Sequence, residues 1–262
     1  MRHDPEISTG TGTLGKAVSV LEMVAEADAP LRFTEILARS GQPRGTLHRQ
    51  LSHLVEEGLL DMVRDFGYVL GLRLLKLAAR AWERNEFRTI AEPHLRALHR
   101  LTGETVHLGV LRGSEIIYLD KVESRQSVRM YSQIGNASPV YCTGVGKAAL
   151  SALTESDRMA LVENLTFKPF TATTHGNRQS LLAEIAVIET CGHAFDREEH
   201  ETGIRCVAAP IWSEDRAFVA GISVTGPSYR VTMAQLQDWA ENVRDAAARI
   251  MADMAVRLGP RR

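Results

Sequence analysis

Cysteine, net charge and aromatic residues are all scarce in this 262-residue chain. Its three cysteines are an odd number without a C-x-x-C pair, which indicates a reducing cytoplasm rather than a disulfide framework. The formal net charge of −1 excludes a strongly basic protein that coats nucleic acid, but it allows one small basic face. Aromatic residues make up 6% of the chain, and we assign most of them to packing.

Long apolar runs are also missing, since none approaches the length of a membrane-spanning helix. The first residues, MRHDPEISTGTGT, lack the apolar segment of a secretory signal, so we expect residues 1–12 to be a flexible arm and no membrane partner. A hydrophobic content of 44% and a charged content of 24% are those of an ordinary soluble protein. The length suits two domains, each able to bury its own core.

Residues 13–70 carry the pattern of three helices and a hairpin. Apolar residues recur at helical spacing over residues 14–25, a short helix is predicted over 33–39, and a third over 44–55. Two short apolar strands then flank a turn, within residues 59–70. This order is that of a winged helix-turn-helix.

A different pattern follows this segment. Residues 71–86 are strongly helical without a second small core, and they predict a linker helix whose apolar side pairs with another copy. Residues 87–262 predict an α+β domain with a mainly antiparallel sheet. We expect its strands at 105–110, 115–120, 127–132, 205–212 and 218–224, and its helices at 89–101, 145–153, 156–164, 180–191 and from 232 onward.

The third predicted helix, PRGTLHRQLSHL, has two different sides. Leu47, Leu51 and Leu54 form one apolar stripe. The other side carries Gly45, His48, Arg49, Ser52 and His53. A merely solvated face is one interpretation.

Three features favour nucleic acid as the partner of this polar side. Gly45 costs about 1 kcal/mol relative to alanine in a helix, and its missing side chain allows close approach of a backbone. The polar side offers donors that suit phosphates and base edges. The preceding helix and turn add three arginines, Arg32, Arg39 and Arg44, against one acid, Glu35.

At this point a family resemblance becomes specific. The segment GKAVSVLEMVAEADAPLRFTEILARSGQPRGTLHRQLSHLVEEGLL resembles the winged helix-turn-helix of the IclR family of bacterial transcription regulators, whose recognition helix has a Pro-x-x-Thr-x-x-Arg-x-Leu core. Pro43, Thr46, Arg49 and Leu51 occupy those places. The similarity continues in order through HLRALHRLTGETVHLGVL, PVYCTGVGKAAL and GHAFDREEHETGIRCVAAPI, and so covers nearly the whole chain.

For the N-terminal domain, the resemblance implies binding of double-stranded operator DNA, with the third helix in the major groove and the hairpin at 61–69 on flanking backbone. The implied DNA-binding residues are Arg32, Arg44, Gly45, Thr46, His48, Arg49, Ser52, His53 and Arg64. Gly45 stands where the family usually has a small side chain such as serine, and Gln50 where leucine is common. We interpret both departures as marks of a different operator preference.

For residues 87–262, the resemblance implies a GAF-like α/β domain that binds a small metabolite, often an organic acid. The implied effector-binding residues are Met130, Ser138, Gly144, Val145, Gly146, Asp196, Cys206, Ser223 and Thr225. Backbone N–H groups near residues 144–146 would hold a carboxylate, and the polar Ser138 indicates a hydrophilic ligand. The resemblance further implies a homodimer or a dimer of dimers in which the linker helix couples ligand and DNA. It implies no cofactor and no catalytic residues.

Three alternative sites are weighed against this interpretation. The segment CTGVGKA resembles a phosphate-binding loop, but Tyr141 replaces its first glycine and Ala148 its Mg²⁺-binding hydroxyl. An enzyme of small-acid metabolism with a site made of Cys206, His200 and Asp196 is conceivable, although no oxyanion motif accompanies it. A metal site from Cys191, His193, His200 and Cys206 matches no zinc spacing, so no metal is assigned.

Overall fold

The computed structural model describes residues 12–126 and 132–258, and the chain divides into two units between Arg84 and Asn85. No helix among the described residues is long and apolar enough to cross a membrane.

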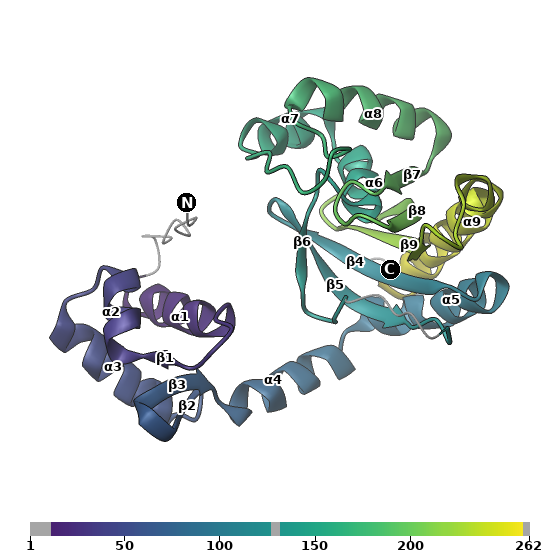
Figure 1. The fold of residues 1–262 in the computed structure, drawn as a ribbon. Helices are drawn as coiled ribbons and strands as arrows, with labels where there is room; N and C mark the ends of the chain where they lie inside the picture. Colours follow the sequence, from purple (N-terminus) through teal and green to yellow (C-terminus); the bar gives the residue numbers. More distant parts are fainter. Residues whose placement is uncertain (1–11, 127–131, 259–262) are drawn as a thin grey trace. The chain divides into compact units, whose positions relative to one another are not determined.

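The N-terminal unit combines helices with a small antiparallel sheet (Figure 1). Its elements are α1 (Gly12–Ala25), β1 (Leu31–Arg32), α2 (Phe33–Ser40), α3 (Arg44–Glu56), β2 (Leu60–Val63), the short 3-10 helix η1 (Arg64–Phe66), β3 (Gly67–Leu70) and α4 (Leu72–Glu83). Strand β3 pairs with both β2 and β1, and β1 was not predicted from the sequence. The predicted winged helix-turn-helix order is confirmed, with Ile36, Leu47 and Leu51 fully buried in its core.

The predicted linker helix is shorter than expected. Helix α4 ends at Glu83, and Glu86 already belongs to the next helix, α5 (Glu86–Thr102). The break occurs because Asn85 has a non-helical backbone, and its side chain accepts a hydrogen bond of 2.9 Å from the N–H of Arg88. The prediction of one continuous helix through residue 86 is therefore wrong.

The C-terminal unit is a six-stranded antiparallel sheet with helices on both faces (Figure 1). Besides α5, its elements are β4 (Thr105–Arg112), β5 (Glu115–Val122), β6 (Ala137–Pro139), α6 (Gly144–Ala152), α7 (Glu155–Glu163), α8 (Arg178–Cys191), β7 (Ala194–Arg197), β8 (Ile204–Trp212), β9 (Val219–Pro227) and α9 (Met233–Leu258). The strand order is β6-β5-β4-β9-β8-β7. The predicted antiparallel α+β class is confirmed, whereas most of the strand expected at 127–132 lies outside the described residues.

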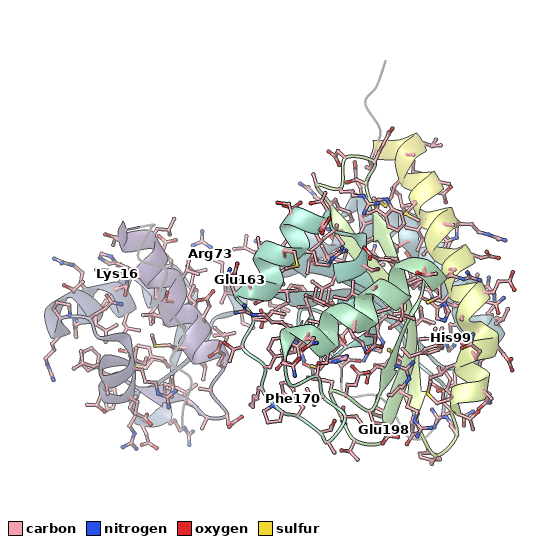
Figure 2. All side chains as sticks on the ribbon, turned by 90° about the horizontal axis from the view of Figure 1, so that it is seen from above. Lys16, Arg73, His99, Glu163, Phe170 and Glu198 are labelled. Atoms are coloured by element: carbon pink, nitrogen blue, oxygen red, sulfur yellow. The ribbon has the colours of Figure 1, made fainter. Side chains whose placement is uncertain are left out.

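Alternation along the strands separates two sets of side chains. In β4 and β9, Val106, Leu108, Ile222 and Val224 belong to the core formed with α5 and α9. A second core lies between the other face and helices α6, α7 and α8, and Figure 2 shows side chains filling the space between helices and sheet. His107 lies between two residues of the first core, so it projects to the second face, where α6 packs.

Candidate DNA interface and effector pocket

The polar side of α3 is exposed as its sequence pattern indicated. Arg44, Gly45, His48, Arg49, Ser52 and His53 are exposed, and Thr46 is half-buried. The leucine stripe on the opposite side is buried against α1, α2 and β2. Seven of the nine predicted DNA-contacting residues thus lie on one helix whose other side holds the core together.

The remaining two predicted DNA contacts lie beside this helix. Arg32 is exposed directly before α2, and its backbone N–H donates to the Glu35 carboxylate at 2.8 Å. That bond occupies the only acid of α2 at the helix start. Arg64 is exposed in the turn between β2 and β3, where the next residue, Asp65, has a left-handed backbone.

Aromatic contacts hold the beginning of α3 against α2. The Arg44 guanidinium lies 5.2 Å from the centre of the Phe33 ring, and the His48 ring meets the same ring edge-on at 6.1 Å. Gly45 lies between them in sequence. Apart from its chain neighbours and the backbone of its own helix, no described atom lies within 4 Å of where its Cβ would be. The glycine is therefore not required by packing within the chain.

Gln50 corrects part of the sequence interpretation. Its side chain is buried, accepts a hydrogen bond of 3.1 Å from Gln42 and donates one of 3.3 Å to the carbonyl of Thr13. It connects α3 to the turn before it and to the start of α1. Because it faces inward, Gln50 cannot read a base, and only Gly45 remains as a departure that bears on operator preference.

A cavity of about 250 Å³ opens in the C-terminal unit between the sheet and the start of α6. Sheet register brings its floor together, because Ser223 pairs with His107 on β4, and Thr225 pairs with Cys206 on β8. Asp196 on β7 lies next to Cys206 in the same row. Residues up to 118 positions apart in sequence therefore share one wall.

Seven of the nine predicted effector-binding residues line this cavity: Ser138, Gly144, Val145, Asp196, Cys206, Ser223 and Thr225. Gly146 does not line the cavity. It packs against Val140, whose carbonyl oxygen would lie 2.4 Å from a Cβ at this position, and its N–H donates to the Thr143 hydroxyl at 3.1 Å. Its N–H is already used as a helix cap, which corrects the expectation that it holds a carboxylate. Met130 lies outside the described residues.

Several polar residues of the cavity were not among the predicted effector-binding residues: His107, Tyr118, Ser132, Asn136, Thr143, His200 and Glu201. Of these, His200 was considered only for the alternative enzyme and metal sites. His107 Nε2 lies 2.7 Å from the Ser132 hydroxyl, and Nδ1 lies 3.2 Å from that of Thr225. Burial, and secondarily the charge of Lys121, lowers the pKa of His107 to about 3, so the ring is neutral. The signal in the sequence was a polar residue alternating with apolar ones in a strand.

Asp196 has an unusual electrostatic environment. It is 6% exposed, and burial raises its pKa to about 7. The N–H of Glu199 donates to its Oδ1 at 2.7 Å and lowers the pKa, while the negative charge of Glu199 raises it. This carboxyl therefore changes its charge near neutral pH, inside the cavity wall.

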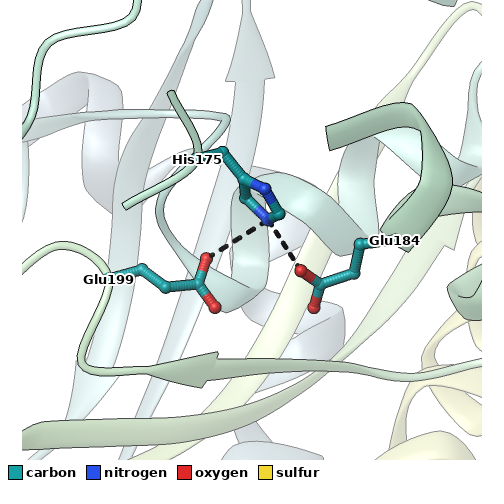
Figure 3. Close-up of side chains that lie close together, drawn as sticks. All are labelled: His175, Glu184 and Glu199. Atoms are coloured by element: carbon teal, nitrogen blue, oxygen red, sulfur yellow. Dashed lines mark hydrogen bonds and ion pairs between the residues drawn. The ribbon is translucent and has the colours of Figure 1, made fainter. Parts of the chain in front are cut away.

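A buried ion-pair cluster lies behind this wall. The Lys147 ammonium is fully buried and lies 2.6 and 2.5 Å from the two carboxylate oxygens of Glu199, and 3.0 Å from Glu184 Oε1. His175 Nε2 lies 2.7 Å from Glu184 Oε2, and Figure 3 shows His175 between the two glutamates. Burial alone would raise the pKa of Glu184, but the contacts with His175 and Lys147 lower it to about 2. Since an ammonium already lies between the carboxylates, this cluster is an ion-pair network and not a metal site.

The loop between α7 and α8 covers the segment after β7. The Thr171 hydroxyl donates to the Glu198 carbonyl at 2.6 Å, and the Phe170 ring lies 4.9 Å from the ring of His200, a cavity residue. Figure 2 labels Phe170 and Glu198 at the same end of the unit. The loop thus holds the segment that carries the cavity residues His200 and Glu201.

The geometry does not suit the two alternative sites. Burial raises the pKa of the Cys206 thiol far above its usual range, which suppresses the thiolate that a nucleophile needs. Of the four residues considered for a metal, His200 and Cys206 line the cavity. Cys191, the last residue of α8, and His193 instead contact each other, with His193 Nδ1 3.1 Å from the Cys191 carbonyl oxygen.

Comparisons with known proteins match both units. Residues 13–63 match the IclR helix-turn-helix domain, and residues 79–252 match the C-terminal domain of bacterial transcriptional regulators of the IclR type. The Escherichia coli K12 regulator XynR is 33% identical over 232 residues, covering 88% of this chain and 92% of XynR. KdgR of the same strain is 31% identical, covering 91% of each chain.

Solved structures agree with these matches. The Thermotoga maritima IclR crystal structure superposes with a TM-score of 0.70 at 31% identity, covering 95% of this chain and 99% of that one. An IclR homologue from Microbacterium hydrocarbonoxydans, complexed with 4-hydroxybenzoate, has a TM-score of 0.76 at 23% identity and covers 93% of this chain and 99% of that one. The second likeness concerns the fold alone.

The matched relatives define a class of proteins that join a helix-turn-helix DNA-binding domain to a C-terminal ligand-binding domain. The chain belongs to the IclR family of bacterial transcriptional regulators. Its relatives are named regulators and repressors, so the alternative of an enzyme of small-acid metabolism is set aside.

The raised pKa of Asp196 predicts how stability depends on pH. The folded-state pKa of about 7 lies above the unfolded value of about 4. This carboxyl therefore stabilises the fold below about pH 4 and loses that contribution as the pH rises through about 7. The free energy of unfolding of Asp196→Asn should rise relative to wild type as the pH increases, by up to about 4 kcal/mol in total.

Denaturant unfolding of both proteins at several pH values between about 4.5 and 8 measures this difference. Glu214→Gln serves as the control, because it removes an exposed acid in the turn between β8 and β9 that does not line the cavity. A difference between Asp196→Asn and wild type that does not change with pH would contradict the prediction.

Proposed function

We propose that this chain regulates transcription by binding an operator through α3, and that a small organic acid in the C-terminal cavity modulates this binding. The observation that carries the proposal is the pairing of an exposed, acid-free face on α3 with a polar cavity in a separate unit. The reducing cytoplasm, where a bacterial operator lies, is the setting of this proposal.

The contacts with DNA are divided by side-chain chemistry. Arg49 and His48 lie toward the middle of the exposed face and are assigned to base edges in the major groove. Arg44, Thr46 and Ser52 are assigned to phosphates or the groove wall, with Ser52 already donating to the His48 carbonyl at 3.0 Å. Arg32, His53 and Arg64 extend the same surface, with Arg64 contacting flanking backbone from the turn of the hairpin.

The effector is assigned to the cavity of about 250 Å³. Helix α6 begins on this cavity with Gly144 and Val145. The N–H of Val145 precedes the first intrahelical donor, Lys147, whereas the N–H of Gly144 is directed at the Cys206 thiol. Hydroxyls of Ser138, Ser223 and Thr225 face the same space and suit a hydrophilic acid. The hydroxybenzoate held by the Microbacterium relative is of this chemical kind.

Helix α4 supports assembly into a homodimer or a dimer of dimers. Its leucines Leu72, Leu75 and Leu77 are 77%, 68% and 55% exposed, an apolar surface that a second copy would cover. Two copies present two recognition helices, so a ligand that changes their spacing changes the fit to two half-sites. The ligand can act only through its different affinity for the two arrangements.

Arg49→Ala should weaken binding to the specific operator by about 1–3 kcal/mol and relax preference at one base position. A fluorescence titration with operator and random DNA measures both effects. Arg112→Ala, which removes an exposed arginine at the end of β4 in the other unit, is the matched control and should leave both affinities unchanged. Equal loss on operator and random DNA would show that Arg49 contacts a phosphate instead.

Gly45→Ala should have opposite effects on stability and on DNA binding. Because no other side chain in the described part of the chain fills the space of a Cβ there, alanine should raise the free energy of unfolding by up to about 1 kcal/mol. Operator affinity should fall, since the added methyl group meets the DNA. Denaturant unfolding measures the change in stability, and titration of the same preparation with operator DNA measures the change in affinity. An unchanged operator affinity would indicate that Gly45 faces solvent and not DNA.

An acid that raises the melting temperature should also change operator affinity by several-fold. Ser223→Ala should weaken binding of that acid by about 2–10-fold, because a hydroxyl on the cavity wall is lost. Ser151→Ala, whose hydroxyl donates to the Ala148 carbonyl on α6, is the control. Identical operator affinity with and without every acid that binds would disprove the coupling.

A further inference from the structure

The cavity contains acidic side chains without a basic partner. Among its described lining residues are two carboxyl groups, Asp196 and Glu201, and neither a lysine nor an arginine. The histidine beside the floor, His107, is neutral. An anionic ligand therefore meets negative charge and no compensating side-chain cation among these residues.

The one buried cation near Asp196 is committed elsewhere. Lys147 is fully buried and contacts both oxygens of Glu199 as well as Glu184. Asp196 itself accepts the N–H of Glu199 on Oδ1, and no ion pair to Asp196 occurs in the described part of the chain. The positive charge of Lys147 is thus already shared by the carboxylates of Glu199 and Glu184, and Asp196 forms no ion pair with it.

The surroundings of Asp196 come from every element packed against it. Cys206 on β8 is its pairing partner, and Lys147 on α6 and Glu184 on α8 lie behind it with Glu199. Lys121 on β5 contacts the carbonyl oxygen of Ser132 at the cavity wall and is paired with Glu123. The other groups on the cavity side are neutral or acidic. These are His107 on β4, Tyr118 on β5, and His200 and Glu201 on the loop between β7 and β8.

The start of α6 lies directly beside Asp196. A Cβ placed on Gly144 would lie 2.4 Å from Cys206 Sγ and 3.5 Å from the backbone nitrogen of Asp196. Gly144, Val145 and Asp196 line the same cavity of about 250 Å³, so a carboxylate held at the start of α6 shares this small space with the Asp196 carboxyl. Two carboxylates in one such site do not both stay ionised, and one of them keeps a proton.

We propose that a monocarboxylate effector binds together with one proton, and that Asp196 holds this proton and donates its O–H to the ligand. The inference rests on the proposed effector site. The step is Asp196 carboxylate plus a proton plus ligand carboxylate, giving a carboxylic acid hydrogen-bonded to a carboxylate; no bond within the ligand breaks. Asp196 thereby becomes a specificity-determining residue that favours ligands with a single negative charge.

The pKa of Asp196, about 7 in the free protein, fits this role because a proton is available at near-neutral pH. A second carboxylate on the ligand would need a further proton or a cation that the described cavity walls do not supply. An uncharged amide of the same shape needs no proton. Comparing the binding of the acid with that of its amide therefore distinguishes the effect of ligand charge from the effect of ligand shape.

Isothermal titration calorimetry of the full chain tests the inference directly. The probes are 4-hydroxybenzoate, pyruvate and lactate, each paired with its amide, in two buffers of different ionisation enthalpy. For an acid that binds, we expect uptake of about 0.9 proton near pH 8 and almost none near pH 6, with affinity falling about 30-fold from about pH 6 to about pH 8.5. The amides should bind with no proton uptake and a flat pH profile.

Asp196→Asn provides the matched variant, because its amide keeps the shape and a donor but has no titrating group. It should bind the same acid with a flat pH profile and no proton uptake. Glu214→Gln, which removes an exposed carboxyl outside the cavity, should keep the pH profile of wild type. The proton count on wild type stands by itself if the Asp196 variant does not fold.

The outcomes separate this inference from the proposed function. Binding of acids without proton uptake at about pH 8 would overturn the inference and leave the effector site in place. Proton uptake that persists in Asp196→Asn would overturn the assignment to Asp196. Binding of no acid at about pH 6 would overturn the organic-acid effector and the inference with it.

Discussion

The buried ion pair between Lys147 and Glu199 is the interaction on which the cavity depends. It joins α6 to the loop after β7, and both partners lie almost wholly out of water. Removing one partner of such a pair typically costs about 3–5 kcal/mol, because the other charge is left buried alone. The pair therefore fixes the start of α6 beside Asp196, and it places a helix N-terminus and a carboxyl in one small space. The same lysine gave the sequence its likeness to a phosphate-binding loop, yet its ammonium faces two glutamates of its own chain.

The local parts of the fold could be predicted from the sequence because each has a strong pattern of its own. The leucine stripe of α3, the helix that begins near residue 232, and the long apolar strands β8 and β9 were all predicted. Reciprocal hydrogen bonds between Thr232 and Gln235 cap that helix, α9. Strands β1, β6 and β7 were missed, since two to four residues hold too little alternation to be recognised. The end of α4 was missed because one asparagine cap interrupts an otherwise helical sequence.

The site was harder to predict than the fold, for a physical reason. His107 and Thr225 meet only through the pairing of β4 with β9, which no local pattern reveals. Family resemblance named Asp196, Cys206 and Ser223, but it could not show that His107 is neutral or that Asp196 forms no ion pair among the described residues. Gln50 was misjudged because it lies at the boundary between the two sides of α3, where helical periodicity alone does not decide burial. Its partners Gln42 and Thr13 decide it.

The alternation of β4 and β9 has a consequence for how such a protein could be redesigned. Val106 and Leu108 maintain the core with α5 and α9, while the residue between them, His107, faces the cavity. The same holds for Ser223, which stands between Ile222 and Val224. Residues that contact the ligand space thus alternate, along the same strands, with residues that hold the core together. A new ligand preference can be introduced at the odd-numbered positions while the even-numbered ones continue to hold the sheet, so the sensor is a replaceable surface on a fixed frame.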